Sequence, residues 1–149
     1  MGQIWKTDVA AAGAKPVVSE KLNSVLGSGA GVVPKTCLQT QTKTSYTTAA
    51  SVTLSLSATS TIATGWGFAV CCSHTSVGVS YRVVRDSTVF TSGTSTALET
   101  SPLAVSGSTV EPNLTSGTYT WAIQYKANGS LTGEYAGCAL PTIYSVGIT

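Results

Sequence analysis

The sequence predicts an all-β protein: an antiparallel sandwich of two sheets, jelly-roll-like, preceded by an extended N-terminal arm that contains a short helix. Two observations predict the β domain. From Thr36 onward the chain is rich in Ser, Thr, Val and Tyr and alternates polar with apolar residues, and turn residues divide it into short segments. A third observation predicts the arm: residues 1–35 show no such alternation. We therefore expect an arm over 1–35 and one β-sandwich domain over 36–149.

The arm has one regular pattern, a short amphipathic helix expected over 17–26. Ser19 can cap it, and Leu22, Val25 and Leu26 would share one face. A helix of this length is marginal in water unless its apolar face is covered. We therefore expect either a neighbouring subunit or the chain's own β domain to cover it.

The β domain divides into segments that combine β-favouring residues with turn residues at their ends. The expected strands are 36–42, 51–58, 66–74, 77–85, 88–92, 97–105, 118–127 and 135–148. Glycines are expected to mark turns between them, at Gly65, Gly93, Gly107 and Gly117. Asn128-Gly129 is expected to close a hairpin. Pro141 lies inside the last segment, so we expect an edge strand or two shorter strands there.

Alternation is clearest in two of these segments. In 51–58 the inward residues are expected to be Val52, Leu54 and Leu56, and in 118–127 they are expected to be Tyr119, Trp121, Ile123 and Tyr125. Short strands at this spacing suit two packed sheets in a jelly-roll order.

A row of aromatic residues raises the alternative of a sugar-stacking platform. The candidates are Trp66, Tyr81, Trp121, Tyr125, Tyr135 and Tyr144. However, Trp66 alternates with Phe68 and Val70, and Trp121 alternates with Ile123. This period is typical of a core, so we expect these rings to be buried.

Charge is scarce and unevenly placed. Only 9% of residues are charged, so Ser and Thr carry most of the surface polarity, which suits a stable β protein inside an assembly. The arm has a net charge of +2 and the β domain is neutral. Without a basic face we expect no nucleic-acid partner. No apolar stretch approaches the ~18–20 residues of a membrane span, so we expect no membrane partner.

The cysteines are Cys37, Cys71, Cys72 and Cys138, and their spacing matches no zinc motif. Neighbouring positions of a strand point to opposite faces, so Cys71 and Cys72 cannot join one local bridge. The start of the chain lacks the basic and apolar regions of a secretion signal, and we expect synthesis in a host cytoplasm. We therefore expect reduced, buried thiols, with a Cys37–Cys138 bridge as the alternative.

Catalytic patterns are weak, and we expect no enzyme, no metal site and no cofactor. His74 is the chain's histidine, and no GxSxG elbow accompanies it. Cys72 would share its strand face but lies two positions away, a poor geometry for proton transfer. The carboxylates expected at solvated turns of the β domain are Asp86, Glu99, Glu111 and Glu134.

Three stretches of the β domain resemble the small jelly-roll domains of tailed-phage virion proteins, found in head decoration proteins and at the tips of head or tail fibres. The first is a Tyr-Thr-x-x-Ala/Ser-Val-x-Leu entry strand, here 46–54. The others are an arginine strand with Arg-Asp-turn-x-Val, here 82–89, and a Gly-x-Tyr-x-Trp/Tyr strand, here 117–125. The resemblance implies a place in the virion and assembly as a homotrimer. It does not extend to the arm.

Together these features predict a capsid decoration or cement protein that binds the major capsid protein, or another virion subunit, through its arm. The expected contacts are apolar anchors at Ile4, Trp5, Val17, Val18, Leu22 and Leu26, with rim lysines at Lys6, Lys15 and Lys21. The alternatives are a receptor-binding fibre tip or tail appendage, which could bind a host glycan, and a free carbohydrate-binding module.

Overall fold

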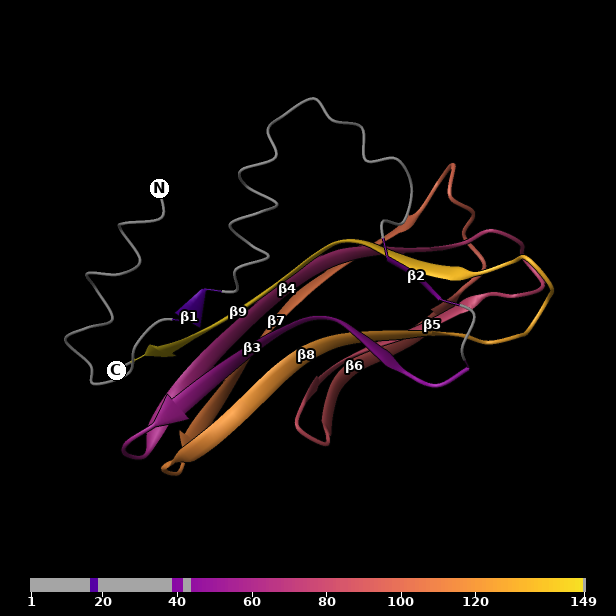
Figure 1. Cartoon of the computed structure of the whole chain (residues 1–149). Coiled ribbons are helices and arrows are strands. Elements are labelled where there is room, and N and C mark those ends of the chain that lie inside the picture. The colour runs from indigo at the N-terminus through magenta and orange to yellow at the C-terminus, as the bar shows by residue number, and fades with distance from the viewer. Residues whose placement is uncertain (1–16, 19–38, 42–43, 149) are drawn as a thin grey trace.

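The structure is a computed structural model that describes residues 17–18, 39–41 and 44–148. These residues form two antiparallel sheets that pack face to face, which confirms the predicted all-β sandwich (Figure 1). The strands are β1 (Val17–Val18), β2 (Gln39–Gln41), β3 (Thr47–Leu56), β4 (Ser60–Cys72), β5 (Val79–Arg85), β6 (Thr88–Ser95), β7 (Leu103–Leu114), β8 (Gly117–Ala127) and β9 (Ala136–Ile148).

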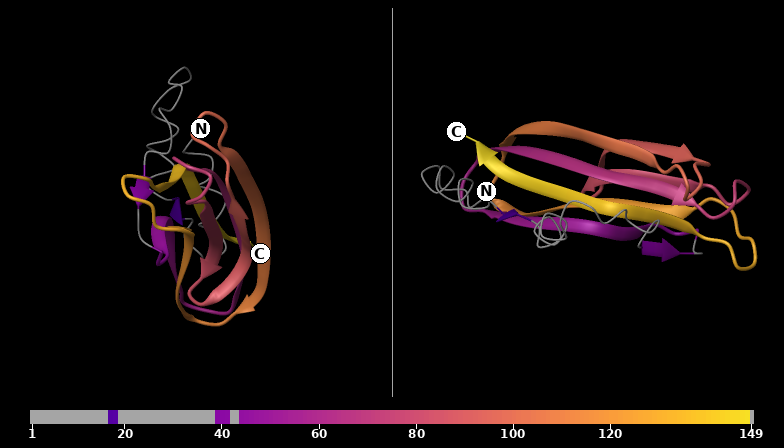
Figure 2. Two further views of the ribbon diagram at one scale, coloured as in Figure 1. Left: turned by 90° about the vertical axis from the view of Figure 1, so that its right-hand side faces the viewer. Right: turned by 90° about the horizontal axis from the view of Figure 1, so that it is seen from above.

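Successive strands of the chain mostly belong to opposite sheets, and the two sheets are the layers seen in Figure 2. One sheet has five strands in the order β1-β9-β4-β7, with β2 also paired to β9. The other has four strands in the order β3-β8-β5-β6. From β3 onward every connection therefore changes sheet except the turn between β5 and β6. Apart from the β5–β6 hairpin, the strands paired within each sheet are distant in the sequence, so the fold depends largely on non-local pairing.

The core lies between the sheets and contains the side chains that alternation predicted. Val52, Leu54 and Leu56 of β3 are buried, as are Trp121, Ile123 and Tyr125 of β8, while Tyr119 packs at the margin. Facing them from β4 and β9 are Ile62, Trp66, Phe68, Val70 and Ile143. Both predicted inward faces are confirmed.

Three glycines predicted as turns lie inside strands instead, namely Gly65 in β4, Gly93 in β6 and Gly107 in β7. Each lies beneath an aromatic ring. A Cβ at Gly107 would lie 2.7 Å from the Trp66 ring, and side chains at the other two would collide with Tyr144 and Tyr81 respectively. The turn prediction was wrong because these glycines make room for rings rather than reversing the chain.

The segment expected as a strand over 97–105 is divided differently. Only its last residues belong to a strand, because β7 begins at Leu103 and continues past Gly107 to Leu114. The Asn128-Gly129 hairpin is also wrong, because β8 and β9 lie in different sheets. Gly129 instead donates its backbone N–H to the Val77 carbonyl at 2.9 Å. This bond ties the crossing loop to the segment before β5.

Pro141 does not end or divide the last strand. β9 runs continuously through it and lies between β4 and the short strands β1 and β2, so it is not an edge strand. The register with β4 shifts between Gly67 and Ala69, and Leu140 has a φ of 47°. A bulge therefore accommodates the proline within a central strand.

The N-terminal elements are short and both pair with β9. Val17 pairs with Ser145 and Val18 with Tyr144, so the first two residues of the expected helix are in a strand. The rest of that helix lies outside the described residues. β2 pairs with Ala136, Gly137 and Cys138. Strand β1, at the edge of its sheet, therefore lies within residues 1–35, the range predicted as the arm.

Candidate functional site

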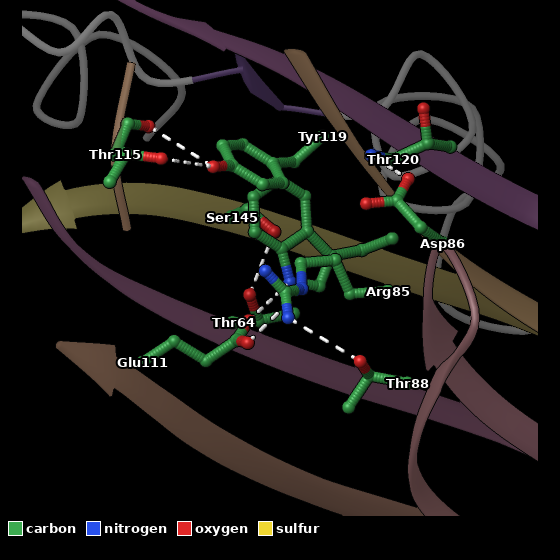
Figure 3. Close-up of polar contacts among 10 residues, drawn as sticks. Thr64, Arg85, Asp86, Thr88, Glu111, Thr115, Tyr119, Thr120 and Ser145 are labelled. Atoms are coloured by element: carbon green, nitrogen blue, oxygen red, sulfur yellow. Dashed lines mark hydrogen bonds and ion pairs between the residues drawn. The ribbon is translucent and has the colours of Figure 1, made fainter. Parts of the chain in front are cut away.

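An inter-sheet cluster of polar side chains occupies one end of the sandwich (Figure 3). Arg85 is the last residue of β5, and Glu111 lies on β7 in the opposite sheet. Arg85 Nε and Glu111 Oε1 are 3.2 Å apart, and the two side chains are only 17% and 13% exposed. Glu111 was expected at a solvated turn, and that expectation was wrong. It is an inward residue of a strand, opposite Ile62 in the register.

Other polar atoms of the cluster also have partners within it. Trp121 Nε1 donates to Glu111 Oε2 at 3.0 Å. The Arg85 guanidinium lies 5.3 Å from the centroid of the Tyr119 ring and donates from Nη2 to the Thr88 hydroxyl at 3.4 Å. Tyr119 donates its hydroxyl to the Thr115 carbonyl at 3.2 Å. A carboxylate held by an arginine and an indole N–H is a poor general base, and the contacts of Glu111 join the two sheets.

The turn expected at Asp86 is confirmed. Asp86 has a φ of 50° and connects β5 to β6. Its Oδ1 accepts the backbone N–H of Thr120 at 3.1 Å, and its own N–H donates to the Thr120 carbonyl at 2.9 Å. Glu99 and Glu134 also lie in turns or loops, but both are half-buried. None of these three forms an ion pair with a described residue.

A Cys–His pair is ruled out by geometry. Cys72 is fully buried, and its thiol donates to the Ala97 carbonyl at 3.4 Å. Burial raises the pKa of the Cys72 thiol, which keeps it protonated and unreactive. His74 is exposed in the following turn, where its Nδ1 accepts the Ser76 N–H at 3.1 Å. The two side chains serve separate local structures.

The expected redox state is wrong for one cysteine. Cys71 is disulfide-bonded, and its partner lies outside the described residues. Cys72 and Cys138 are buried thiols, so the Cys37–Cys138 bridge considered as an alternative does not form. Cys71 is on the outer face of β4 because Cys72 faces the core, as the strand alternation predicts.

No group of three or more His, Cys, Asp or Glu residues in the described part of the chain is arranged to hold a metal ion. Across the same residues, no helix combines the length and apolarity that spanning a membrane requires.

The outer positions of β4, β7 and β9 form a surface that we call the five-stranded face. Its centre is made of small residues: Ala63, Gly65, Gly67 and Ala69 on β4, flanked by Ala104, Ser106 and Ser108 on β7. Large apolar residues surround this strip, with Val110 57%, Ile148 43% and Tyr144 38% exposed. None of these outer positions is charged. An uncharged surface with several exposed large apolar residues is a candidate protein interface.

The opposite surface, the outer positions of β3, β8 and β5, is the four-stranded face, and its composition is different. Hydroxyl groups pair across its strands: Thr53 with Thr120 at 3.0 Å, and Ser55 with Thr118 at 3.1 Å. Near the other end of these strands lie Arg82 and Lys126. The sandwich therefore has one uncharged, apolar outer face and one that is hydroxylated and cationic.

The aromatic residues are mostly core, as expected. Trp121 and Tyr125 are almost completely buried, and Trp66 stacks against Phe90 with ring centroids 6.4 Å apart. Burial raises the pKa of Tyr125 to about 12, with a smaller contribution from Cys138. Tyr81 and Tyr135 are half-buried, and Tyr144 is exposed on the five-stranded face over Gly65. The rings do not form the exposed row that a stacking platform needs.

Of the predicted arm contacts, the structure places only Val17 and Val18, whose backbones form β1 on β9. The others lie outside the described residues: Ile4, Trp5, Lys6, Lys15, Lys21, Leu22 and Leu26. The inter-sheet cluster and the two contrasting faces were not predicted from the sequence. The alternation of polar residues on β3 and β8 was the one signal for the hydroxyl pairs.

No protein-family model matches the chain, and no curated protein matches it. Among solved structures, the chain is similar to the insecticidal delta-endotoxin Cry8Ea1 from Bacillus thuringiensis, at 13% identity and a TM-score of 0.42. The match covers 74% of this chain and 19% of the toxin chain. We draw nothing about function from a likeness at this level.

Proposed function

We propose that this chain is a structural protein of a tailed-phage virion, specifically a capsid decoration or cement protein that binds the head shell. The strand order supports a jelly-roll form, because β1 and β2 beside β9 complete two interleaved sets of strands as two Greek keys do. The sequence resemblance of 46–54, 82–89 and 117–125 to virion jelly rolls supports the same class.

The observation that carries the proposal is the five-stranded face. Val110, Tyr144 and Ile148 are exposed around a strip of alanine, glycine and serine, without a charged residue. Burying such a face against a coat subunit removes apolar area from water and desolvates no charge. Small residues along the centre allow close approach of a neighbouring surface.

The arm adds to this contact. Ile4, Trp5, Val17, Val18, Leu22 and Leu26 would supply apolar anchors, and Lys6, Lys15 and Lys21 would supply rim contacts. β1 pairs residues 17–18 of the arm with Ser145 and Tyr144, and Tyr144 lies on the five-stranded face. In a homotrimer three arms would act together, and the effective concentration would strengthen weak individual contacts.

The inter-sheet cluster supports a role other than catalysis. Glu111, whose side chain is 13% exposed, accepts from Trp121 and pairs with Arg85. The buried Cys72 thiol has a raised pKa. The Glu111 carboxylate and the Cys72 thiol are thus engaged in holding the fold together.

The proposal is tested by co-sedimentation with phage heads assembled without this chain. Deleting residues 1–16 leaves β1 and β2 in place, and deleting 1–34 also removes β1. We expect both to remain folded and trimeric and to lose most head binding. Undiminished binding by the longer deletion would overturn the role of the arm.

The five-stranded face is tested with a matched pair of charge insertions. Val110→Glu places a carboxylate on this face, and Val89→Glu places one at a similarly exposed valine of β6, with exposures of 57% and 48% in the native chain. We expect Val110→Glu to weaken head binding at least about tenfold and Val89→Glu to bind as the native chain does. Equal binding by the two variants would overturn the assignment of this face.

A fibre tip or receptor-binding appendage is the second candidate, and a different observation favours it: the cations on the four-stranded face. The copy number per virion separates the two candidates. Many copies, matching the shell lattice, are expected for a decoration protein, and few for an appendage. Quantitative gel densitometry of purified virions against the coat protein measures this ratio.

A further inference from the structure

Two cations on the four-stranded face lie over a single aromatic ring. The Arg82 guanidinium carbon is 3.9 Å from the centroid of the Tyr46 ring, and Lys126 Nζ is 5.2 Å from it. The register explains the grouping: Arg82 lies opposite Gln124 and Ser80 opposite Lys126, so the two cations are diagonal neighbours on β5 and β8. All three side chains are half-buried.

The guanidinium of Arg82 is held in one orientation. Its Nε donates to Gln124 Oε1 at 2.7 Å, and Gln124 Nε2 in turn donates to the Thr48 hydroxyl at 3.4 Å. The two terminal amino groups of Arg82 hydrogen-bond to no described residue. A guanidinium fixed in this way presents a planar pair of donors, which matches the oxygens of a carboxylate, phosphate or sulfate.

These cations lack a counter-charge in the described part of the chain. The ion pair formed there is Arg85–Glu111, and the strands β3, β5, β6 and β8 contain no acidic residue. Like charges brought close together repel each other. Cation–π attraction to the Tyr46 ring offsets this by only about 0.5–2 kcal/mol per cation. An anion seated here would neutralise both charges.

The surroundings favour a sugar as the carrier of that anion. On the same face as Arg82 and Lys126, strands β3 and β8 carry the hydroxyl pairs Thr53–Thr120 and Ser55–Thr118. Hydroxyl and amide groups can both donate to and accept from sugar hydroxyls. Tyr46 adds an aromatic edge beside the cations. A free inorganic anion would use the cations alone and leave this polar strip without a role.

We propose that the four-stranded face binds an acidic saccharide, with its carboxylate, phosphate or sulfate on Arg82 and Lys126 and its sugar rings along the hydroxyl pairs. This function is separate from shell attachment, because it uses the opposite side of the sandwich. It supplies a decoration protein with an outward face that holds an acidic cell-surface polymer.

Isothermal titration calorimetry on the full chain tests the site with four probes: a heparin hexasaccharide, maltohexaose, a hexaglutamate peptide and inorganic phosphate. We expect binding of the heparin hexasaccharide, weakening with salt, and none of maltohexaose. If phosphate or hexaglutamate binds as tightly as the acidic saccharide, the saccharide assignment is overturned. Absence of heparin binding at low ionic strength overturns the site itself.

Substitutions test whether the named residues bind the heparin hexasaccharide. Arg82→Gln and Lys126→Gln should each weaken heparin binding by at least about tenfold, and Tyr46→Ala should weaken it more than Tyr46→Phe. Val110→Gln, at an exposed position on the opposite, five-stranded face, is the control and should retain affinity for the acidic hexasaccharide. Near-UV circular dichroism checks the fold of each variant, so Lys126→Gln still tests the site if Arg82→Gln does not fold. Unchanged affinity in the folded cation variants contradicts the proposal, whatever the result of the head-binding experiments.

Discussion

Glu111 of β7 crosses the sandwich to pair with Arg85 of β5, with Oε1 3.2 Å from Nε, and its second oxygen accepts the Trp121 indole N–H at 3.0 Å. One carboxylate thus binds two residues of the opposite sheet at an end where the apolar core gives way to polar side chains. Both partners of the ion pair are mostly shielded from water.

Removing this carboxylate should destabilise the sandwich. Glu111→Gln keeps an acceptor for Trp121 but leaves Arg85 unpaired, and we expect a loss of about 1–3 kcal/mol in the free energy of unfolding. Glu111→Leu should cost more, because the indole N–H also loses its acceptor. Urea unfolding followed by tryptophan fluorescence measures both. Glu134→Gln, in the loop before β9, is the control and should stay within about 0.5 kcal/mol of the native chain. If Glu111→Gln costs no more than this control does, the ion pair does not stabilise the fold.

The glycine beneath Trp66 should not tolerate a methyl group. A Cβ at Gly107 would lie 2.7 Å from the indole ring, so we expect Gly107→Ala to cost about 1–3 kcal/mol. Gly67, on the adjacent strand, has open space where a Cβ would be. We expect Gly67→Ala to be neutral or stabilising by up to about 1 kcal/mol. Thermal unfolding of the two variants compares them directly, and similar melting temperatures would contradict the packing role of Gly107.

Stability should fall in strong alkali because of Tyr125. Burial raises the pKa of its hydroxyl from 10.0 to about 12. Between these values the unfolded chain loses the proton while the folded chain keeps it. The contribution is therefore fully present below about pH 10 and is lost as the pH rises toward 12, on the order of 2–3 kcal/mol in total.

Absorbance at 295 nm during a pH titration should show a tyrosine ionisation step at about pH 12. Tyr125→Phe should lose this late step and lose part of the decline in stability between pH 10 and 12. Absence of an ionisation step near pH 12 in the folded protein would contradict the burial of this hydroxyl.

The three described cysteines should differ in their reactivity toward iodoacetamide. In native buffer Cys72 should remain unmodified, because it is buried and its pKa is raised. In denaturant without reductant, Cys72 and Cys138 should react and Cys71 should not, since it is disulfide-bonded. After reduction all three should react. Peptide mass spectrometry shows which cysteines are modified, and labelling of Cys71 before reduction would contradict the disulfide.

Much of the sandwich was predictable because its information is local. Val52, Leu54 and Leu56 alternate with Ser and Thr, and a strand with one apolar side must bury that side. The same reasoning placed Trp121 and Ile123 in the core. The Asp86 turn was also predictable, since Asp tolerates a positive φ at a turn.

Features that depend on a distant neighbour could not be predicted in this way. Gly107 has the same signature in the sequence as a turn glycine, and only the Trp66 ring across the sheet distinguishes the two. Glu111 looked solvated because Arg85 and Trp121 are far from it along the chain. The pairing of Val17–Val18 with β9 likewise joins the two ends of the chain.

The amino-acid sequence alone determined that this chain is a β-sandwich, which side of its clearest strands is buried, and that charge is rare, because these follow from composition and a two-residue period. The tertiary structure decided which strands are neighbours, which glycines lie beneath rings, which carboxylate joins the sheets, and that the two outer faces differ in chemistry. These depend on contacts between residues far apart along the chain, and the free energy of those contacts is set by the packing of both sheets together.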